Sequence, residues 1–180
     1  MPVLGGSRLP SSIATSDREE GRALVIGCGF IGSRLTEELL RNGAGHRVLT
    51  RSRPGEDLVA RLGDERLVIG DAGDRGVLGM ALDGIDHVVY AAGGLLPVAS
   101  EREPDRDAEL TLAPLRTLLA ELRTRPDISL TYLSSGGTIY GEPEVVPVDE
   151  SQPTRPRGVY GRLHLLCEEE VLAQVREHGL

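Results

Sequence analysis

A chain of 180 residues can form one domain with a sizeable core but not two domains of ordinary size. Its formal net charge of −8 argues against a nucleic-acid partner, and no run of about 18 apolar residues is present that would span a membrane. All 20 basic residues are arginine, because the sequence contains no lysine. We therefore expect a one-domain protein with no nucleic-acid partner, no membrane contact and no metal site.

The first 21 residues differ in composition from the rest. The segment 1–21 is rich in Ser, Gly and Pro and lacks the apolar centre of a secretion signal, so we expect a disordered leader followed by one domain over 22–180. Two cysteines, Cys28 and Cys167, are too few for a disulfide framework. We expect both to be reduced thiols, which favours a cytoplasmic location.

A short apolar run over 23–26 ends in glycines at the spacing GxGxxG, and the apolar periodicity of 30–40 predicts a helix directly after it. Such a strand-to-helix turn typically holds the pyrophosphate of a dinucleotide. Gly27 permits the tight turn, Gly29 leaves room for the phosphate, and Gly32 lets helix and strand pack closely. The anion would lie on the unpaired N–H groups of the helix N-terminus. The alternative is a glycine turn that serves packing alone.

A second strand is predicted over 46–50, and Arg51 and Arg53 follow it. An NAD site usually places a carboxylate here, about 20 residues after the first glycine, to accept hydrogen bonds from the adenosine 2′-hydroxyl. Two guanidinium groups suit a 2′-phosphate instead, because they bind it through charge-assisted hydrogen bonds. We therefore expect NADP in preference to NAD. The alternative is that both arginines are solvated loop charges.

The remaining elements continue the alternation of strands and helices. Strands are predicted over 67–70, 87–92 and 128–133, helices over 77–82, 108–123 and 160–176, and loops over 95–107 and 140–156. The fourth strand ends in small residues at positions 91–94, which would pass close under a bound ligand. Strands that alternate with helices in this way predict an α/β fold, a doubly wound parallel sheet of the Rossmann type.

In this order the motifs resemble those of the extended short-chain dehydrogenase/reductases, and more narrowly the NAD(P)-dependent epimerase/dehydratase family that acts on nucleotide sugars. The most specific match is the string LSSGGTIYGEP at 133–143, followed by PVDE at 147–150 and PRGVYG at 156–161. The resemblance covers about residues 22–180 and places Tyr160 as the tyrosine of a YxxxK motif. Members of the family continue past this helix into a substrate lobe, so the resemblance implies a truncated chain whose C-terminal substrate lobe is missing.

The resemblance also implies the contacts with the cofactor. They are Gly27, Gly29, Phe30, Ile31 and Gly32 for the pyrophosphate, Arg51 and Arg53 for the adenosine ribose, Asp71 and Ala72 for the adenine, and Ala91, Ala92 and Gly93 for the nicotinamide ribose and phosphates. Family members often dimerise through two helices that correspond to 108–123 and 160–176. A homodimer is therefore expected, the alternative being that both apolar faces pack only on the sheet.

The expected catalytic group departs from the family pattern. An unperturbed phenol titrates at about pH 10, so a tyrosine that removes a sugar hydroxyl proton near neutral pH needs nearby positive charge. In the family a lysine four residues after Tyr160 supplies that charge and binds the nicotinamide ribose, whereas here the residue is His164. An ordinary histidine is mostly neutral at pH 7. The usual residue that polarises the substrate oxygen is Gly136 here, which leaves Ser135 or Thr138 for that role.

Three interpretations of the sequence stay open. In the first, Tyr160 and His164 form a variant catalytic pair in a nucleotide-sugar epimerase, dehydratase or reductase that works by hydride transfer. In the second, the domain binds NAD or NADP without turnover and serves as a regulatory or scaffolding module. In the third, the pocket is no longer filled. The replaced lysine and Gly136 together predict slow hydride chemistry in the first case.

Overall fold

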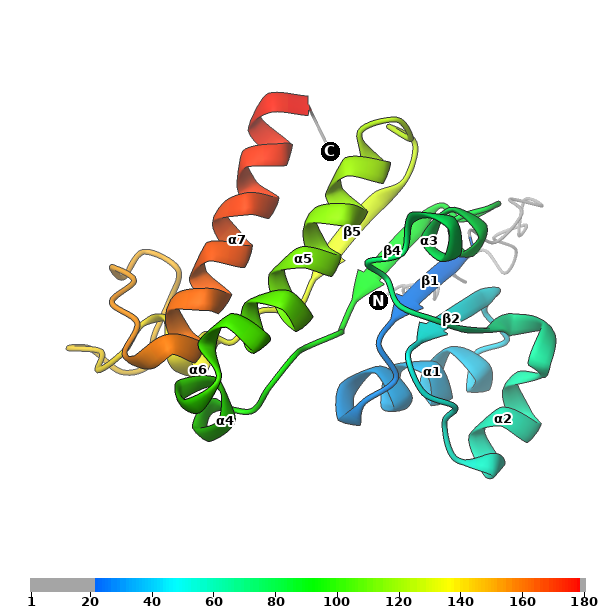
Figure 1. Ribbon diagram of the computed structural model, residues 1–180, viewed down its shortest axis with the longest axis horizontal. Coiled ribbons are helices and arrows are strands. Elements are labelled where there is room, and N and C mark those ends of the chain that lie inside the picture. The colour runs from blue at the N-terminus through cyan, green and yellow to red at the C-terminus, as the bar shows by residue number, and fades with distance from the viewer. Residues whose placement is uncertain (1–21, 179–180) are drawn as a thin grey trace, which may run out of the picture.

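The computed structural model describes residues 22–178, so the expected leader over 1–21 lies outside the described residues. Five parallel strands form one sheet in the order β3-β2-β1-β4-β5 (Figure 1). The strands are β1 (Ala23–Ile26), β2 (His46–Thr50), β3 (Leu67–Ile69), β4 (His87–Tyr90) and β5 (Ser129–Tyr132). The chain moves outward from β1 in one direction and then from β4 in the other, which confirms the predicted doubly wound arrangement.

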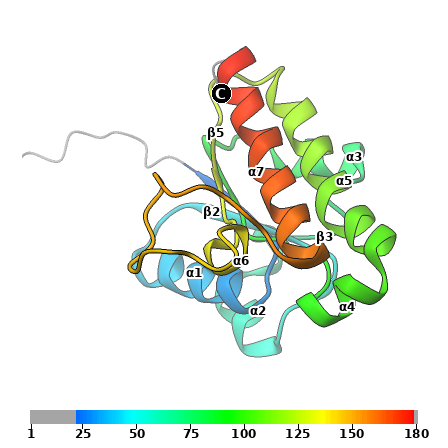
Figure 2. The same ribbon diagram turned by 90° about the vertical axis from the view of Figure 1, so that its left-hand side faces the viewer.

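Helices cover both faces of this sheet. They are α1 (Phe30–Arg41), α2 (Glu56–Leu62), α3 (Arg75–Ala81), α4 (Pro97–Arg102), α5 (Pro104–Leu122), α6 (Gly136–Ile139) and α7 (Gly158–His178), with a 3-10 turn η1 at Asp64–Arg66. Helices α5 and α7 pack side by side with α3 over one face, and α1 and α2 cover the other (Figure 2).

Strand β1 shows how the sequence forms two cores. Leu24 and Ile26 point into a large apolar cluster with α3, α5 and α7, whereas Val25 points into a small one with Val48 and Leu62. Successive side chains of a strand face opposite sides of its sheet, so an uninterrupted apolar run buries residues on both. The burial of β1 on both faces fixes the position of the glycine turn that follows it.

The prediction of a loop over 95–107 is wrong. This segment contains α4 and the first turn of α5, and each of these helices begins at a proline, Pro97 or Pro104. Proline is favoured at the first helical position, because the N–H group that proline lacks would have no partner within the helix there. The sequence interpretation treated both prolines as signs of a loop, and it also missed α2, whose seven residues are too few to show a clear periodicity.

The apolar faces of the two long helices differ. In α5, Leu112, Leu115, Leu118, Leu119 and Leu122 are all buried. In α7, Leu172 and Val175 are 51% and 44% exposed. The leucine face of α5 is therefore used in packing within the domain, whereas α7 keeps large apolar side chains at the surface. The homodimer stays a prediction.

Three further features concern the described part of the chain. Within residues 22–178, no helix combines the length and the apolar character needed to cross a bilayer. The same residues contain no group of three or more His, Cys, Asp or Glu side chains placed to hold a metal ion. Cys28 and Cys167 are unpaired thiols, one half-buried and one buried.

Candidate functional site

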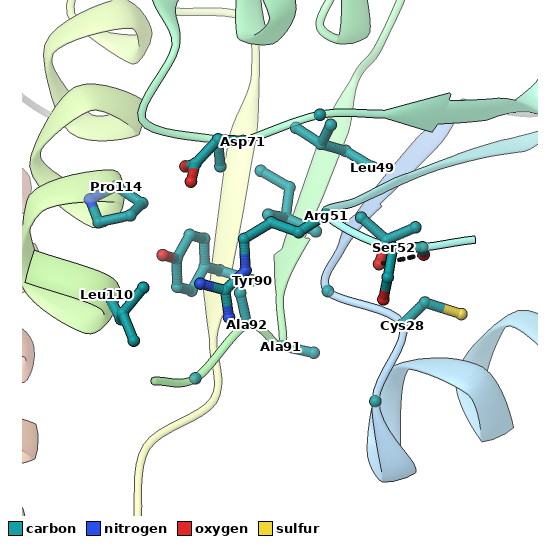
Figure 3. Close-up of a pocket in the computed structure, with 17 residues that line it drawn as sticks. Cys28, Leu49, Arg51, Ser52, Asp71, Tyr90, Ala91, Ala92, Leu110 and Pro114 are labelled. Carbon is teal, nitrogen blue, oxygen red and sulfur yellow. Dashed lines mark hydrogen bonds between the residues drawn. The ribbon is translucent and has the colours of Figure 1, made fainter. Parts of the chain in front are cut away.

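A cavity of about 250 Å³ opens at the carboxyl ends of the strands, where the direction of winding reverses (Figure 3). Parallel α/β sheets bind their ligands in this crevice. Eight of the residues predicted to contact a cofactor line it, namely Gly27, Gly29, Arg51, Asp71, Ala72, Ala91, Ala92 and Gly93. The structure therefore brings together, in one cavity, residues that follow four different strands.

The three glycines of the turn have different surroundings. Gly27 has φ +95°, and a Cβ there would lie 2.6 Å from the backbone of Ala92. At Gly32 a Cβ would overlap the carbonyl oxygen of Gly27, so the start of α1 can lie this close to β1 only with glycine. At Gly29 no atom lies within 4 Å of an added Cβ. The first and third glycines thus serve the close packing of the chain, and the second leaves open space at the mouth of the cavity.

The N-terminus of α1 is adjacent to this open space. Its N-cap residue is Gly29, which has no side chain to accept from the first-turn N–H groups, and no acidic residue lies in that turn. These N–H groups and the helix dipole favour an anion. The side chains of Phe30 and Ile31 are 86% and 58% exposed and do not line the cavity, so any contact from these two residues would come from the backbone.

The two arginines after β2 are placed differently. The Arg51 side chain crosses the cavity in Figure 3, whereas Arg53 forms an exposed ion pair, with its Nη2 2.7 Å from Asp64 Oδ1. Across the cavity from β2, Asp71 accepts a hydrogen bond from the Gly73 N–H at 2.7 Å. Of the two arginines, Arg51 therefore brings its guanidinium group to the cavity and Arg53 does not.

Three of the lining residues that the sequence interpretation did not predict are Tyr90, Leu110 and Pro114. Tyr90 is the last residue of β4, and Leu110 and Pro114 lie one helical turn apart on α5. Residues four apart share one face of a helix, so the predicted helix over 108–123 already placed Leu110 and Pro114 together. What the sequence did not indicate was which face of that helix would meet the cavity.

The predicted catalytic pair lies outside this cavity, on the first turns of α7. The rings of Tyr160 and His164 have centroids 4.3 Å apart with their planes inclined at 44°. His164 is 7% exposed, and its Nδ1 lies 3.5 Å from Tyr132 Oη. Burial lowers the pKa of His164 although the carboxylates of Asp107 and Glu168 act in the opposite direction. The lowered pKa favours the neutral form of the His164 imidazole.

Ser135 directly precedes the short helix α6, and Thr138 lies on it. The Thr138 hydroxyl donates to the Ser135 carbonyl at 3.0 Å, and Ser135 is the N-cap residue of α6 without a side-chain cap bond. Helix α6 packs against α7, where a Cβ added to Gly161 would lie 2.9 Å from the Thr138 carbonyl oxygen. The structure thus brings Thr138 close to the residue after Tyr160, and neither of the two hydroxyl residues lines the cavity.

A buried carboxylate connects the loop after β4 to α5. Asp107 is 1% exposed, and its Oδ1 accepts from the Leu95 N–H at 2.8 Å and from the Thr111 hydroxyl at 2.9 Å. Its Oδ2 has no hydrogen-bond partner among the described residues. Because the sequence interpretation placed Asp107 in a loop, its role in fixing the chain beyond Gly93 was missed.

The five-stranded parallel sheet, its helices and the cavity at the glycine turn define a Rossmann-type α/β domain. The sequence pattern of the NAD dependent epimerase/dehydratase family matches residues 23–180, and the chain belongs to this family. The expected resemblance is thereby confirmed.

Several relatives of known name are similar to the chain. UDP-glucose 4-epimerase of Corynebacterium glutamicum is 29% identical over 154 residues, which are 86% of this chain and 46% of that protein. The structure of Thermus thermophilus UDP-glucose 4-epimerase in complex with NAD is 29% identical with a TM-score of 0.78, over 88% of this chain and 52% of that one. The Thermotoga maritima UDP-glucose 4-epimerase, solved with UDP-glucose, gives 27% identity, a TM-score of 0.78 and the same two coverages. The chain spans about half the length of these relatives.

Proposed function

We propose that the chain binds NAD or NADP in the cavity at the glycine turn and takes part in hydride transfer to and from a nucleotide sugar. The observation that carries the proposal is the open space at Gly29, which borders the uncapped start of α1. The glycines on either side of it, Gly27 and Gly32, leave no room for a side chain. A pyrophosphate fits such a place. Similar proteins solved with NAD and with UDP-glucose support the choice of ligands.

The residues around the cavity fit the two ends of such a ligand. In this proposal the N–H groups at the start of α1 hold the pyrophosphate, and Arg51 and Asp71 contact the adenosine end. Ala91 to Gly93 would lie beneath the nicotinamide ribose, where their small side chains leave room for it. The unpaired thiols of the two cysteines support the cytoplasmic location that we also propose.

When bound, the nicotinamide would accept a hydride from a sugar carbon and return it. The proton of the sugar hydroxyl would go to the Tyr160 phenolate oxygen, with the Ser135 or Thr138 hydroxyl donating to the sugar oxygen. A neutral His164 adds no positive charge beside Tyr160, so the phenolate would form less readily than beside a lysine. We therefore propose a low rate of turnover.

The same histidine favours a second candidate function, binding of the dinucleotide without turnover. His164 is buried, neutral and next to Tyr132, and the sequence contains no lysine that could replace it. A domain with these residues can still hold the ligand through the glycine turn, because His164 does not line the cavity. In that case the bound dinucleotide would act as a regulatory signal or a structural element.

Binding and product formation separate these functions. We expect isothermal titration to show binding of NAD(H) or NADP(H), and incubation with UDP-glucose to yield slow formation of UDP-galactose, followed by anion-exchange chromatography. Chromatography is needed because an epimerase returns the hydride, so the net nicotinamide absorbance does not change. GDP- and dTDP-sugars serve as further substrates. Binding without any product would leave only the second function, and absence of binding would overturn both.

Arg51 provides the test of the expected preference for NADP. We expect Arg51→Ala to weaken NADPH binding about 10-fold more than NADH binding, because a charge-assisted hydrogen bond to the 2′-phosphate contributes roughly 1.5 kcal/mol or more. Arg53→Ala is the matched control, since Arg53 pairs with Asp64 outside the cavity and is expected to change neither affinity. Equal losses for the two nucleotides would contradict the preference.

A further inference from the structure

The hydroxyl of Tyr90 is a buried polar group without a partner. Tyr90 is 1% exposed, and among the described residues its Oη has no hydrogen-bond partner. Native proteins bond nearly all of their buried polar atoms, so an isolated hydroxyl requires an explanation. Tyr90 also lines the cavity, which means that a ligand in the cavity is within reach of this residue.

The surroundings of Tyr90 indicate which part of a ligand would reach it. In Figure 3 its ring lies near the Arg51 side chain, and its hydroxyl lies among Leu110, Pro114 and Asp71. Arg51 and Asp71 follow β2 and β3, which are the two strands farthest from β5 in the sheet. Tyr160 lies on α7, which packs against α5 beyond β4. A dinucleotide with its nicotinamide toward Tyr160 would therefore place its adenosine end beside Tyr90.

The protonation of Tyr90 determines what it can offer. Burial raises the pKa of Tyr90 far above its ordinary value, the charge of Asp71 raises it further, and Arg51 opposes this only in part. The hydroxyl thus keeps its proton at neutral pH, and it can act as a hydrogen-bond donor. The apolar side chains of Leu110 and Pro114 provide no acceptor for it.

We propose that the Tyr90 hydroxyl donates a hydrogen bond to the adenosine diphosphate half of the bound dinucleotide. The inference rests on the proposed binding of NAD or NADP but not on turnover. It assigns to Tyr90 a binding contribution that the neighbouring Tyr132 does not share, although the two rings are only 6.0 Å apart. Tyr132 does not line the cavity, and its Oη faces His164 Nδ1 at 3.5 Å.

The test compares Tyr90→Phe with Tyr132→Phe in the full chain, using ADP and NAD as probes in isothermal titration. We expect Tyr90→Phe to weaken ADP and NAD by the same factor, about 3- to 10-fold, the range of one neutral hydrogen bond. The melting temperature of unliganded Tyr90→Phe should be equal to or above that of the unsubstituted protein, because the substitution removes only an unpartnered hydroxyl. Tyr132→Phe should leave the affinity for ADP unchanged.

Four other outcomes of these titration and melting experiments would contradict the proposed hydrogen bond from Tyr90. Unchanged affinity of Tyr90→Phe, while the unsubstituted protein binds ADP and NAD, overturns the inference and leaves the proposed function standing. A loss confined to NAD places the contact at the nicotinamide half and overturns the assignment to the adenosine end. A lower melting temperature of unliganded Tyr90→Phe means that the hydroxyl is already bonded within the protein. If the unsubstituted protein binds neither probe, the proposed function fails together with the inference.

Discussion

Alanine at position 29 is expected to leave the domain folded and to weaken NAD binding by roughly 10- to 100-fold, the effect of losing one charge-assisted hydrogen bond. The added methyl group meets no protein atom within 4 Å, so nothing in the fold has to move. It does occupy the space into which a phosphate would come to reach the N–H groups of α1. Circular dichroism measures the first expectation and isothermal titration the second.

Gly32→Ala is the matched variant with the opposite pattern. Its Cβ would overlap the Gly27 carbonyl oxygen, so α1 would have to move away from β1, and we expect the free energy of unfolding to fall by about 3 kcal/mol. Chemical denaturation measures this loss. If Gly29→Ala bound NAD as tightly as the unsubstituted protein, the pyrophosphate would not lie at this turn. If Gly32→Ala were as stable as the unsubstituted protein, the close approach of α1 and β1 would be absent in solution.

The second large effect is expected from His164→Lys, which should raise turnover of a nucleotide sugar about 10-fold, because lowering a phenol pKa by one unit raises the phenolate fraction tenfold. Burial opposes a positive charge at position 164, and two neighbouring carboxylates favour one. The carboxylates of Asp107 and Glu168 both favour the protonated form at position 164, and Asp107 Oδ2 lacks a hydrogen-bond partner among the described residues. Turnover is measured as UDP-galactose formed from UDP-glucose at pH 7.

Two controls show whether the gain arises from charge beside Tyr160. His164→Gln keeps a neutral polar side chain and should give no gain. In the His164→Lys background, Tyr160→Phe should remove the gained activity, since it deletes the phenol that the ammonium group would assist. A gain in His164→Gln, or activity that survives without the Tyr160 hydroxyl, would contradict the role of this pair as acid and base.

The glycine turn was predictable from the sequence because the spacing of its glycines depends only on the geometry of the strand and helix that it joins. A strand buried on both faces requires an uninterrupted apolar run, and the close approach of α1 to β1 requires glycine at position 32, so both constraints are visible within ten residues. The doubly wound parallel sheet followed in the same way from the alternation of strands and helices. Most of the fold and the centre of the cavity were therefore contained in local patterns.

The unpredicted parts of the site depend on contacts between distant segments. The ion pair of Arg53 with Asp64 removes one of two expected guanidinium groups from the cavity, and nothing near Arg53 in the sequence indicates this. The predicted strand over 87–92 already included Tyr90, but the lack of a hydrogen-bond partner for its hydroxyl depends on which face of α5 lies opposite. The missed start of α4 and α5 has another cause. Each of these helices begins with a proline, and proline can begin a helix as well as end one.

The two cores described above are of unequal size. The smaller one, built from Val25, Val48 and Leu62, fills the space beneath α1 and α2 on one face of the sheet, whereas the larger one joins the other face to α3, α5 and α7. Regions with fewer buried apolar contacts open more readily. The cavity is lined by Gly29 at the start of α1 and by Leu110 on α5, so a bound ligand would connect the face with the smaller core to a helix of the larger one, and its occupancy would lower how often α1 opens.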